Sequence, residues 1–240
     1  MTTALYLDDA YQRQAEGRVT ALTAEGGIVL NASLFYPTAG GQPGDSGHLE
    51  WQGRRLMIAT AIKGTGDDIV LVPAEPAALP PVGTHVTQTL DWERRHRLMR
   101  MHTALHLLSV VIPRPVTGGQ IAEAKGRLDF DMQDPPDDRD GLTDRLNGLI
   151  AADLPVTWQW ITQAELDSQP ELIKTLSVKP PRGADQVRLV QIGQGADQID
   201  LQPCGGTHVR STIEIGALRL GKIEKKGRQN RRVYLHLEDG

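Results

Sequence analysis

Two short motifs, far apart in the chain, carry the residue types best suited to chemistry. His102 and His106 stand at positions i and i+4, and Cys204 and His208 have the same spacing with two glycines between them. Residues i and i+4 lie one above the other on a helix face, so the first motif can aim two imidazoles at one point. The glycines of the second motif permit a sharp turn that brings a thiolate and a third imidazole together. Three nitrogen donors and one sulfur donor suit one tetrahedral Zn²⁺ per chain better than a hard cation.

Two other interpretations of these residues are open at this stage. A single cysteine is often a small buried hydrophobe, and the histidines could be ordinary core or surface residues. A helical histidine pair is also typical of zinc metalloproteases, but those enzymes need a glutamate directly after the first histidine. Thr103 occupies that position here, which argues against a protease.

The composition is that of an ordinary globular protein. Of the 240 residues, 39% are hydrophobic and 23% are charged, and the chain is long enough for two domains with separate cores. One cysteine cannot form an internal disulfide, which fits a reducing compartment. The first residues lack the pattern of a secretory leader, and no apolar run approaches the ~20 residues of a membrane span. We therefore expect a cytoplasmic protein with no membrane partner.

Charge is distributed unevenly along the chain, although the net charge is only −4. Residues 219–232 contain seven lysines and arginines against the single acidic residue Glu224. Such a segment favours a polyanion as partner, with ordinary solvated surface as the alternative. The candidate nucleic-acid contacts are Lys225, Lys226, Arg228, Arg231 and Arg232.

Residues 1–90 have the pattern of a small β-barrel. A glycine pair at residues 26–27 separates two apolar pieces and indicates a hairpin. Further strands are expected at residues 47–51, 55–62, 68–72 and 85–90. A glycine-rich motif around Gly40, Gly41 and Gln42 could expose backbone amides to a ligand or could form a tight connection between strands. It lacks the lysine of a P-loop, so nucleotide binding is not indicated.

Residues 91–240 have the pattern of an α+β sandwich with an antiparallel sheet. Asp91 can cap a helix that runs to Val111, with an apolar face beside the histidines, and a flexible loop is expected at residues 116–120. The other expected elements are strands at residues 127–132, 156–161, 187–192, 198–201, 213–223 and 232–237, a helix with Leu142, Leu146, Leu149 and Ile150 in its core face, and a short helix capped by Thr162 and Glu165. The predicted fold class is therefore α+β, with a boundary between residues 90 and 91.

With these motifs in place, the chain resembles the AlaX family of free-standing alanyl-tRNA editing proteins, relatives of the editing domain of alanyl-tRNA synthetase. The resemblance covers nearly the whole length, and the N-terminal barrel matches the medium-length form of the family. It rests on His102-x-x-x-His106, Arg127-Leu-Asp-Phe130, Gln202-Pro-Cys-Gly-Gly-Thr-His-Val-Arg210 and Tyr36-Pro-Thr-Ala-Gly-Gly-Gln42. It implies an ATP-independent, zinc-dependent deacylase for translation fidelity, which hydrolyses the ester joining serine, and secondarily glycine, to tRNA(Ala).

Such an enzyme must remove serine and spare alanine. A synthetase pocket built for a methyl group cannot strongly reject glycine or serine, so a second site has to hydrolyse their esters. That site can spare alanine if a polar group pairs with the serine hydroxyl and is left unpaired by a methyl. Our candidates are Thr117 first, then Gln120 beside Gly118 and Gly119 in the same loop, and Thr103 next to the first ligand. A hydroxyl residue often precedes the second histidine in related synthetase domains, and here Leu105 stands at that position.

The role of zinc is left open by the residues. Four protein ligands describe a closed, structural site, whereas a catalytic site keeps one position for water. Either one histidine is displaced, or the ion expands its coordination and polarises water or the ester, or it only orders the pocket. The alternative function is a non-catalytic tRNA-binding module with structural zinc. We expect a monomer or a weak dimer.

Overall fold

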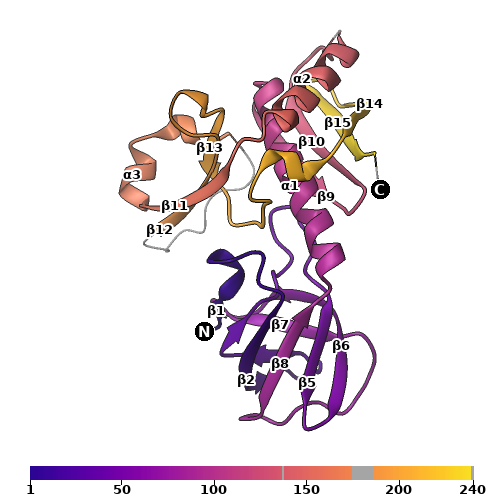
Figure 1. Ribbon diagram of the computed structural model, residues 1–240, viewed down its shortest axis with the longest axis vertical. Helices are drawn as coiled ribbons and strands as arrows, with labels where there is room; N and C mark the ends of the chain where they lie inside the picture. The colour runs from indigo at the N-terminus through magenta and orange to yellow at the C-terminus, as the bar shows by residue number, and fades with distance from the viewer. Residues whose placement is uncertain (137, 175–185, 239–240) are drawn as a thin grey trace. The chain divides into compact units, whose positions relative to one another are not determined.

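The computed structural model describes residues 1–136, 138–174 and 186–238, and the chain divides into two compact units (Figure 1). Unit 1 comprises Met1–Arg97 and unit 2 comprises Leu98–Gly240. The division falls inside helix α1 (Trp92–Val111), whereas the boundary expected at residues 90 and 91 marks the start of that helix. Within the described residues, no helix combines the length and the apolar character needed to cross a bilayer.

Unit 1 is a closed antiparallel barrel, so the predicted β-barrel is confirmed. Alternating residues of its strands face the interior, as in β5, where every second side chain is buried. The barrel order is β2 (Gln14–Leu22), β3 (Ile28–Leu30), β7 (Ile69–Pro73), β6 (Arg54–Lys63), β5 (Gly47–Trp51) and β8 (His85–Leu90). Beside it lie η1 (Leu5–Leu7) and a parallel pair formed by β1 (Thr3–Ala4) and β4 (Ala32–Ser33).

A buried ion pair joins the first turn of α1 to the glycine-rich segment of unit 1. Arg95 and Asp45 are both about 1% exposed, and the Arg95 Nε donates to both Asp45 carboxylate oxygens at 2.9 and 3.0 Å. The remaining Arg95 donors reach the carbonyls of Ala10 and Leu34, and Asp45 also accepts from the Tyr36 amide at 2.5 Å. Because every charged group here has a partner, the pair can be accommodated out of water.

The glycine-rich motif itself is a tight turn. The amide of Gln42 donates to the Ala39 carbonyl at 2.9 Å, and the amide of Ala39 donates back at 3.1 Å. Gly40 and Gly41 form the tip with φ of +55° and +81°, a region that favours glycine. Both tip glycines are exposed and Gln42 is buried, so the tip of this motif faces solvent.

Unit 2 combines helices with two antiparallel sheets, which confirms the α+β fold class (Figure 1). The four-stranded sheet has the order β14 (Leu218–Lys226), β15 (Asn230–Leu237), β10 (Lys125–Asp131) and β9 (Val116–Ile121). The three-stranded sheet has the order β11 (Val156–Thr162), β12 (Gln186–Ile192) and β13 (Asp200–Pro203). The remaining elements are α2 (Arg139–Ala151), α3 (Gln163–Asp167), η2 (Pro170–Leu172), η3 (Gly195–Asp197) and η4 (Thr212–Ile215).

Helix α1 packs directly on the four-stranded sheet. A Cβ added to Gly126 of β10 would lie 2.7 Å from the Met101 sulfur and 3.1 Å from a Leu105 methyl. Only a glycine therefore lets the helix approach this strand so closely. Helix α2 is fixed to β14 by its Asn147 side chain, which accepts from the Leu218 amide at 3.0 Å and donates to the Leu218 carbonyl at 2.9 Å.

Two predictions made from the sequence for unit 2 were wrong. Residues 116–120 are not a loop but belong to strand β9, because their backbone pairs with β10 and a Cβ at Gly119 would come within 3.1 Å of Leu128. The glycines there give close packing rather than flexibility. The last strand pair begins at Leu218, not at residue 213, because Ser211 and Glu214 form a capping box that starts η4. Gly216, with φ of +72°, then ends that turn.

Candidate metal centre

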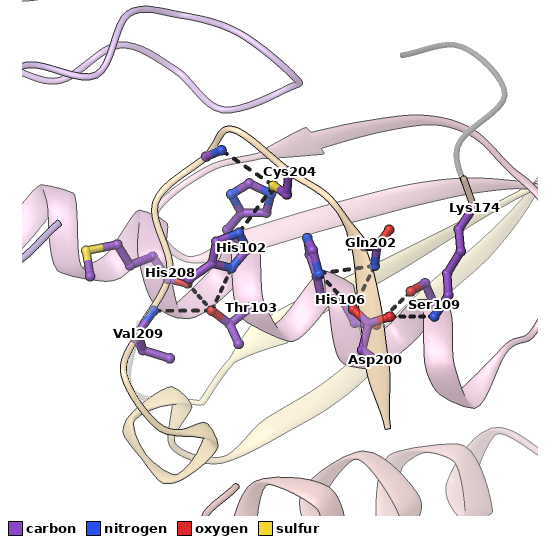
Figure 2. A network of polar contacts seen from close by, with 12 residues as sticks. His102, Thr103, His106, Ser109, Lys174, Asp200, Gln202, Cys204, His208 and Val209 are labelled. Carbon is purple, nitrogen blue, oxygen red and sulfur yellow. Dashed lines mark hydrogen bonds and ion pairs between the residues drawn. The ribbon is translucent and has the colours of Figure 1, made fainter. Parts of the chain in front are cut away.

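The four predicted ligands converge in unit 2 (Figure 2). Helix α1 supplies His102 and His106, and the loop after β13 supplies Cys204 and His208. One donor atom from each residue lies within 4.8 Å of all the others. The three histidines are only 6–8% exposed and the cysteine is half-buried. Helix residues 101–109 are all buried, so the face that carries the histidines is enclosed as well as the apolar face.

The distances within the cluster fit a tetrahedral metal site. The Cys204 sulfur lies 3.5 Å from His102 Nε2 and 3.3 Å from His208 Nε2. Zinc bonds of 2.3 Å to sulfur and 2.0–2.1 Å to nitrogen place two such ligand atoms about 3.5 Å apart across a tetrahedron edge. The side chains are therefore already spaced as one metal ion would require, and their soft and borderline donors fit zinc.

Thr103 fixes the ring of His208. Its hydroxyl donates to the Met99 carbonyl at 3.0 Å and accepts from the Val209 amide at 3.3 Å. The hydroxyl has one proton, so its 3.1 Å contact with His208 Nδ1 requires that Nδ1 carry the hydrogen. The lone pair of His208 then lies on Nε2, the atom that faces the Cys204 sulfur.

Asp200 performs the same task for His106. Its Oδ2 lies 2.9 Å from His106 Nδ1 and accepts from Nε2 of the Gln202 side chain at 2.8 Å, and its Oδ1 pairs with the Lys174 ammonium (Figure 2). Burial opposes ionisation of Asp200, but His106 and Lys174 together hold its pKa below the usual value. An ionised Asp200 accepts the Nδ1 hydrogen and leaves Nε2 of His106 for a metal, the arrangement common to metal-binding histidines.

The same contacts shift the proton affinities of the cluster. Burial disfavours the charged form of His106, but its hydrogen bonds to Asp200 and Cys204 outweigh burial and raise the pKa of His106 to about 9. Burial and the charge of His102 lower the pKa of His208 to about 3. Burial would raise the pKa of the Cys204 thiol, but the neighbouring imidazoles lower it well below its usual value. A thiolate is thus favoured in place, and a metal would displace the proton of His106 as it binds.

Arg188 of β12 holds the loop that carries Cys204. Its Nη1 donates to the carbonyls of Cys204 and Gly206 at 3.1 and 3.0 Å, and the Cys204 amide donates to the Arg188 carbonyl at 3.0 Å. The Gly206 amide in turn points at the Cys204 sulfur at 3.4 Å. An amide directed at the sulfur favours the thiolate form.

The predicted substrate-contacting residues lie in two places. Thr103 is within the metal cluster, where a substrate hydroxyl could bond to it only in exchange for one of its present partners. Thr117 lies on β9 and donates to the Asp129 carbonyl at 3.1 Å, with Asn230 also in reach. Gly118, Gly119 and Gln120 follow on the same strand, where Gln120 accepts from Arg127 at 3.2 Å.

The predicted tRNA contacts lie in different environments, because alternate side chains of β15 project to opposite faces of the sheet and other contacts lie in or near the turn before it. Arg232 forms a double hydrogen bond with Asp129 at 2.7 and 2.9 Å, and Arg231 is buried on the opposite face of the strand. Lys226 pairs with Glu224 at 3.4 Å. Lys225 and Arg228 are exposed, and Arg228 lies in the turn that follows Gly227.

Sequence reasoning missed the residues that orient the ligands, namely Lys174, Arg188, Asp200 and Gln202 as a positioning set. One signal was available for two of them. Asp200 and Gln202 alternate along β13, and Cys204 follows directly after that strand with the same spacing of two; alternate residues of a strand share a face. Once Cys204 is a ligand, the two polar residues before it are expected to face the same site.

Two family models match the chain. One describes the second additional domain of threonyl and alanyl tRNA synthetases and matches residues 187–234, which include Cys204 and His208. The other describes class II (A) tRNA synthetases and matches residues 6–94, nearly all of unit 1. The barrel and the segment that carries Cys204 and His208 are thus each similar to a part of class II tRNA synthetases.

Curated relatives identify the family within that class. An alanyl-tRNA editing protein AlaX-M from Methanosarcina acetivorans is 34% identical over 249 residues, with both chains covered in full. The AlaX-M of Saccharolobus solfataricus is 33% identical over 240 residues, with 98% of each chain covered. An alanine-tRNA ligase from Pyrobaculum neutrophilum is 33% identical over 239 residues. The match covers 93% of this chain and 25% of that enzyme. The chain belongs to the AlaX family of alanyl-tRNA editing proteins, and the resemblance inferred from its motifs is confirmed.

Replacing Asp200 with asparagine should weaken zinc binding by about 10- to 100-fold, because an outer carboxylate that orients a histidine ligand typically has an effect of this size. Competition with a chromophoric chelator measures the affinity. Asp197→Asn is the matched control, since Asp197 is exposed in η3 of the same hairpin and should leave affinity unchanged. Equal affinities for Asp200→Asn and wild type would show that Asp200 does not orient His106.

Proposed function

We propose that the chain is a trans-editing deacylase that hydrolyses the ester joining serine, and secondarily glycine, to tRNA(Ala). This proposal rests on the four-residue cluster in a member of the alanyl-tRNA editing family. Two of its imidazoles are oriented by hydrogen bonds at Nδ1, His208 by Thr103 and His106 by Asp200. The names of the relatives support alanyl-tRNA editing in general. We infer the serine and glycine substrates from the fact that a synthetase pocket built for alanine cannot strongly reject these two amino acids. We place the activity in the cytoplasm, on a monomer or weak dimer, with one Zn²⁺ per chain.

In this proposal His102, His106, Cys204 and His208 hold the zinc. When bound, zinc supplies a positive charge that orders the pocket and, if a coordination position opens, polarises water or the ester carbonyl. Thr103 and Asp200 keep hydrogen on the Nδ1 atoms of His208 and His106, so that each ring presents its Nε2 lone pair to the cluster. A bound Cys204 thiolate is unavailable as a nucleophile, which excludes a covalent acyl-cysteine route.

Serine selection in this proposal requires a hydroxyl or amide that a methyl group leaves unpaired. Thr117 remains our first candidate, with Gln120 on the same strand and Thr103 at the cluster. The neighbouring Gly118 and Gly119 have no side chain to compete for the same space. Removing the Thr117 hydroxyl separates this role from general binding, since it should reduce serine removal and leave tRNA affinity intact.

The decisive experiment is single-turnover deacylation of seryl-tRNA(Ala) beside glycyl- and alanyl-tRNA(Ala), with zinc content measured on the same protein. We expect rapid loss of serine, slower loss of glycine and persistence of alanine. The four protein ligands favour one second candidate, a tRNA-binding module with a structural zinc, because closed four-ligand sites are typically structural. Tight tRNA binding without hydrolysis of any ester would establish that candidate and reject the enzyme.

Charge reversal in the β14–β15 turn should weaken tRNA binding and flatten its salt dependence. We propose phosphate contacts for the exposed Lys225, Lys226 and Arg228, and not for Arg231, which is buried, or Arg232, which is bonded to Asp129. Lys225 and Arg228 are the residues chosen for mutation, because Lys226 pairs with Glu224. The slope of log affinity against log salt should fall by about one for each cation that no longer binds a phosphate. Filter binding over a salt series measures it, with Arg145→Glu on the exposed face of α2 as control. An unchanged slope would make the turn ordinary surface.

A further inference from the structure

An exposed tryptophan pair lies on edge strand β11 of the three-stranded sheet. Trp158 and Trp160 are 41% and 39% exposed, and their ring centroids are 6.4 Å apart at an interplanar angle of 75°. Single exposed hydrophobic residues are ordinary, but two adjacent indoles with this much open surface form a potential contact site. Strand β11 has a neighbour on one side only within the described sheet, so the pair lies at its edge.

The strand register places this pair on the same face of the sheet as the residues that support the metal cluster. Trp158 pairs with Val190, which pairs with Gln202 of β13. Directly paired residues project to the same face, and Gln202 on that face reaches Asp200, the partner of His106. The indoles and the positioning groups of the cluster therefore share one surface of the sheet.

The second tryptophan is connected to the metal cluster itself through its paired residue on β12. Trp160 pairs with Arg188, and the Arg188 carbonyl accepts the amide of Cys204 at 3.0 Å. Neighbouring strands are separated by about 4.8 Å, so the backbone of Trp160 is only about 10 Å from that of Cys204. This distance is within the reach of a single nucleotide placed between them.

The buried Arg188 side chain lies against the tryptophan pair on this face of the sheet. Its guanidinium lies 5.6 Å from the centroid of the Trp158 ring, while its Nη1 is held by the carbonyls of Cys204 and Gly206. A cation fixed beside an aromatic ring favours a ligand that has both a flat ring and a phosphate. A nucleotide has both a flat ring and a phosphate.

We propose that Trp158 and Trp160 form a stacking platform for the base of the 3′-terminal nucleotide of the acylated tRNA. This inference rests on the proposed function, since the ester that is hydrolysed is attached to the ribose of that terminal adenosine. When the ester lies at the His/Cys cluster, the adenine is one ribose away and lies over the tryptophan pair. The platform then positions the ester without touching the amino acid, so it serves serine and glycine alike.

The test uses uncharged tRNA(Ala) with its complete 3′ end and the same tRNA lacking the terminal adenosine. Removing the adenosine should weaken binding to the wild-type chain by about 5- to 100-fold, the range for one base stacked on an aromatic side chain. The Trp158→Ala/Trp160→Ala double variant should bind both tRNAs with equal, weak affinity, because the two deletions remove the same interaction. The double variant Trp158→Phe/Trp160→Phe should restore most of the difference.

Zinc content and circular dichroism establish that each variant is folded, and Ile213→Ala, at an exposed apolar residue of η4, is the matched control. Full sensitivity to the adenosine in the alanine variant, or none in the wild type, would overturn the platform. So would loss of self-association in the alanine variant with tRNA binding intact, which would make the pair a protein interface. Because no hydrolysis is involved, failure of the deacylase assay and failure of the platform give separate results.

Discussion

Replacing His106 with alanine should lower zinc affinity by more than about 100-fold, beyond the effect of losing an outer partner of a ligand. It should lower single-turnover deacylation of seryl-tRNA(Ala) to the background rate. The reason is that His106 is the ligand with the most complete support, from Asp200 and Gln202 behind its ring. Its removal also leaves the buried Asp200 carboxylate with one charged partner fewer.

Metal content by atomic absorption, chelator competition and the deacylation rate are measured on the same preparation. His85→Ala is the matched control, because His85 is an exposed histidine on barrel strand β8 and should change none of the three. If the variant fails to fold, Cys204→Ser tests the same site with a smaller change in volume. A chain that keeps full zinc affinity and activity in either variant would show that the cluster is not the metal centre.

Replacing Asp45 with alanine should destabilise unit 1 by about 3–5 kcal/mol, the usual effect of leaving a buried charge without its partner. Arg95 would stay buried with only the carbonyls of Ala10 and Leu34 as acceptors, and the Tyr36 amide would lose its carboxylate. Hydrogen exchange measured by mass spectrometry is the appropriate readout, because it follows the amides of unit 1 separately in a chain of two units.

A surface ion pair in the same barrel provides the control for this prediction. Glu50 accepts from Arg55 at 2.8 Å, but the two side chains are 40% and 61% exposed, so Glu50→Ala should have little measurable effect. Replacing both Asp45 and Arg95 with apolar residues of similar volume should recover much of the protection against exchange. Unchanged exchange in Asp45→Ala would mean that water reaches Arg95 and that the pair is not buried in solution.

The elements with strong local signals could be predicted from the sequence. Asp91 and the apolar spacing after it marked helix α1, and Thr162 with Glu165 marked the capping box of α3. Strand β9 could not, because Gly118 and Gly119 have low intrinsic strand preference and form a strand only when β10 is beside them. The pairing partner is a long-range property that no local window contains.

The candidate site likewise contains residues that could be predicted from local sequence and residues that could not. The spacing of His102 with His106 and of Cys204 with His208 is local, and each pair could be recognised by itself. Lys174 reaches Asp200 and Thr103 reaches His208 only after the chain has folded, so their roles depend on contacts between distant segments. Likewise, the basic segment looked continuous in the sequence, but strand alternation buries Arg231 and gives Arg232 to Asp129.

The position of the cluster has a consequence for how unit 2 stays folded. A metal ion joining His106 to Cys204 would close a loop that contains α2, strands β9 and β10 of the four-stranded sheet and all of the three-stranded sheet. In the chain-entropy model, cross-linking a loop of about 100 residues stabilises the folded state by about 4.7 kcal/mol. A chain with one cysteine cannot obtain this from a disulfide. The metal would thus be the chain's cross-link, one that works in a reducing compartment and that a chelator can remove.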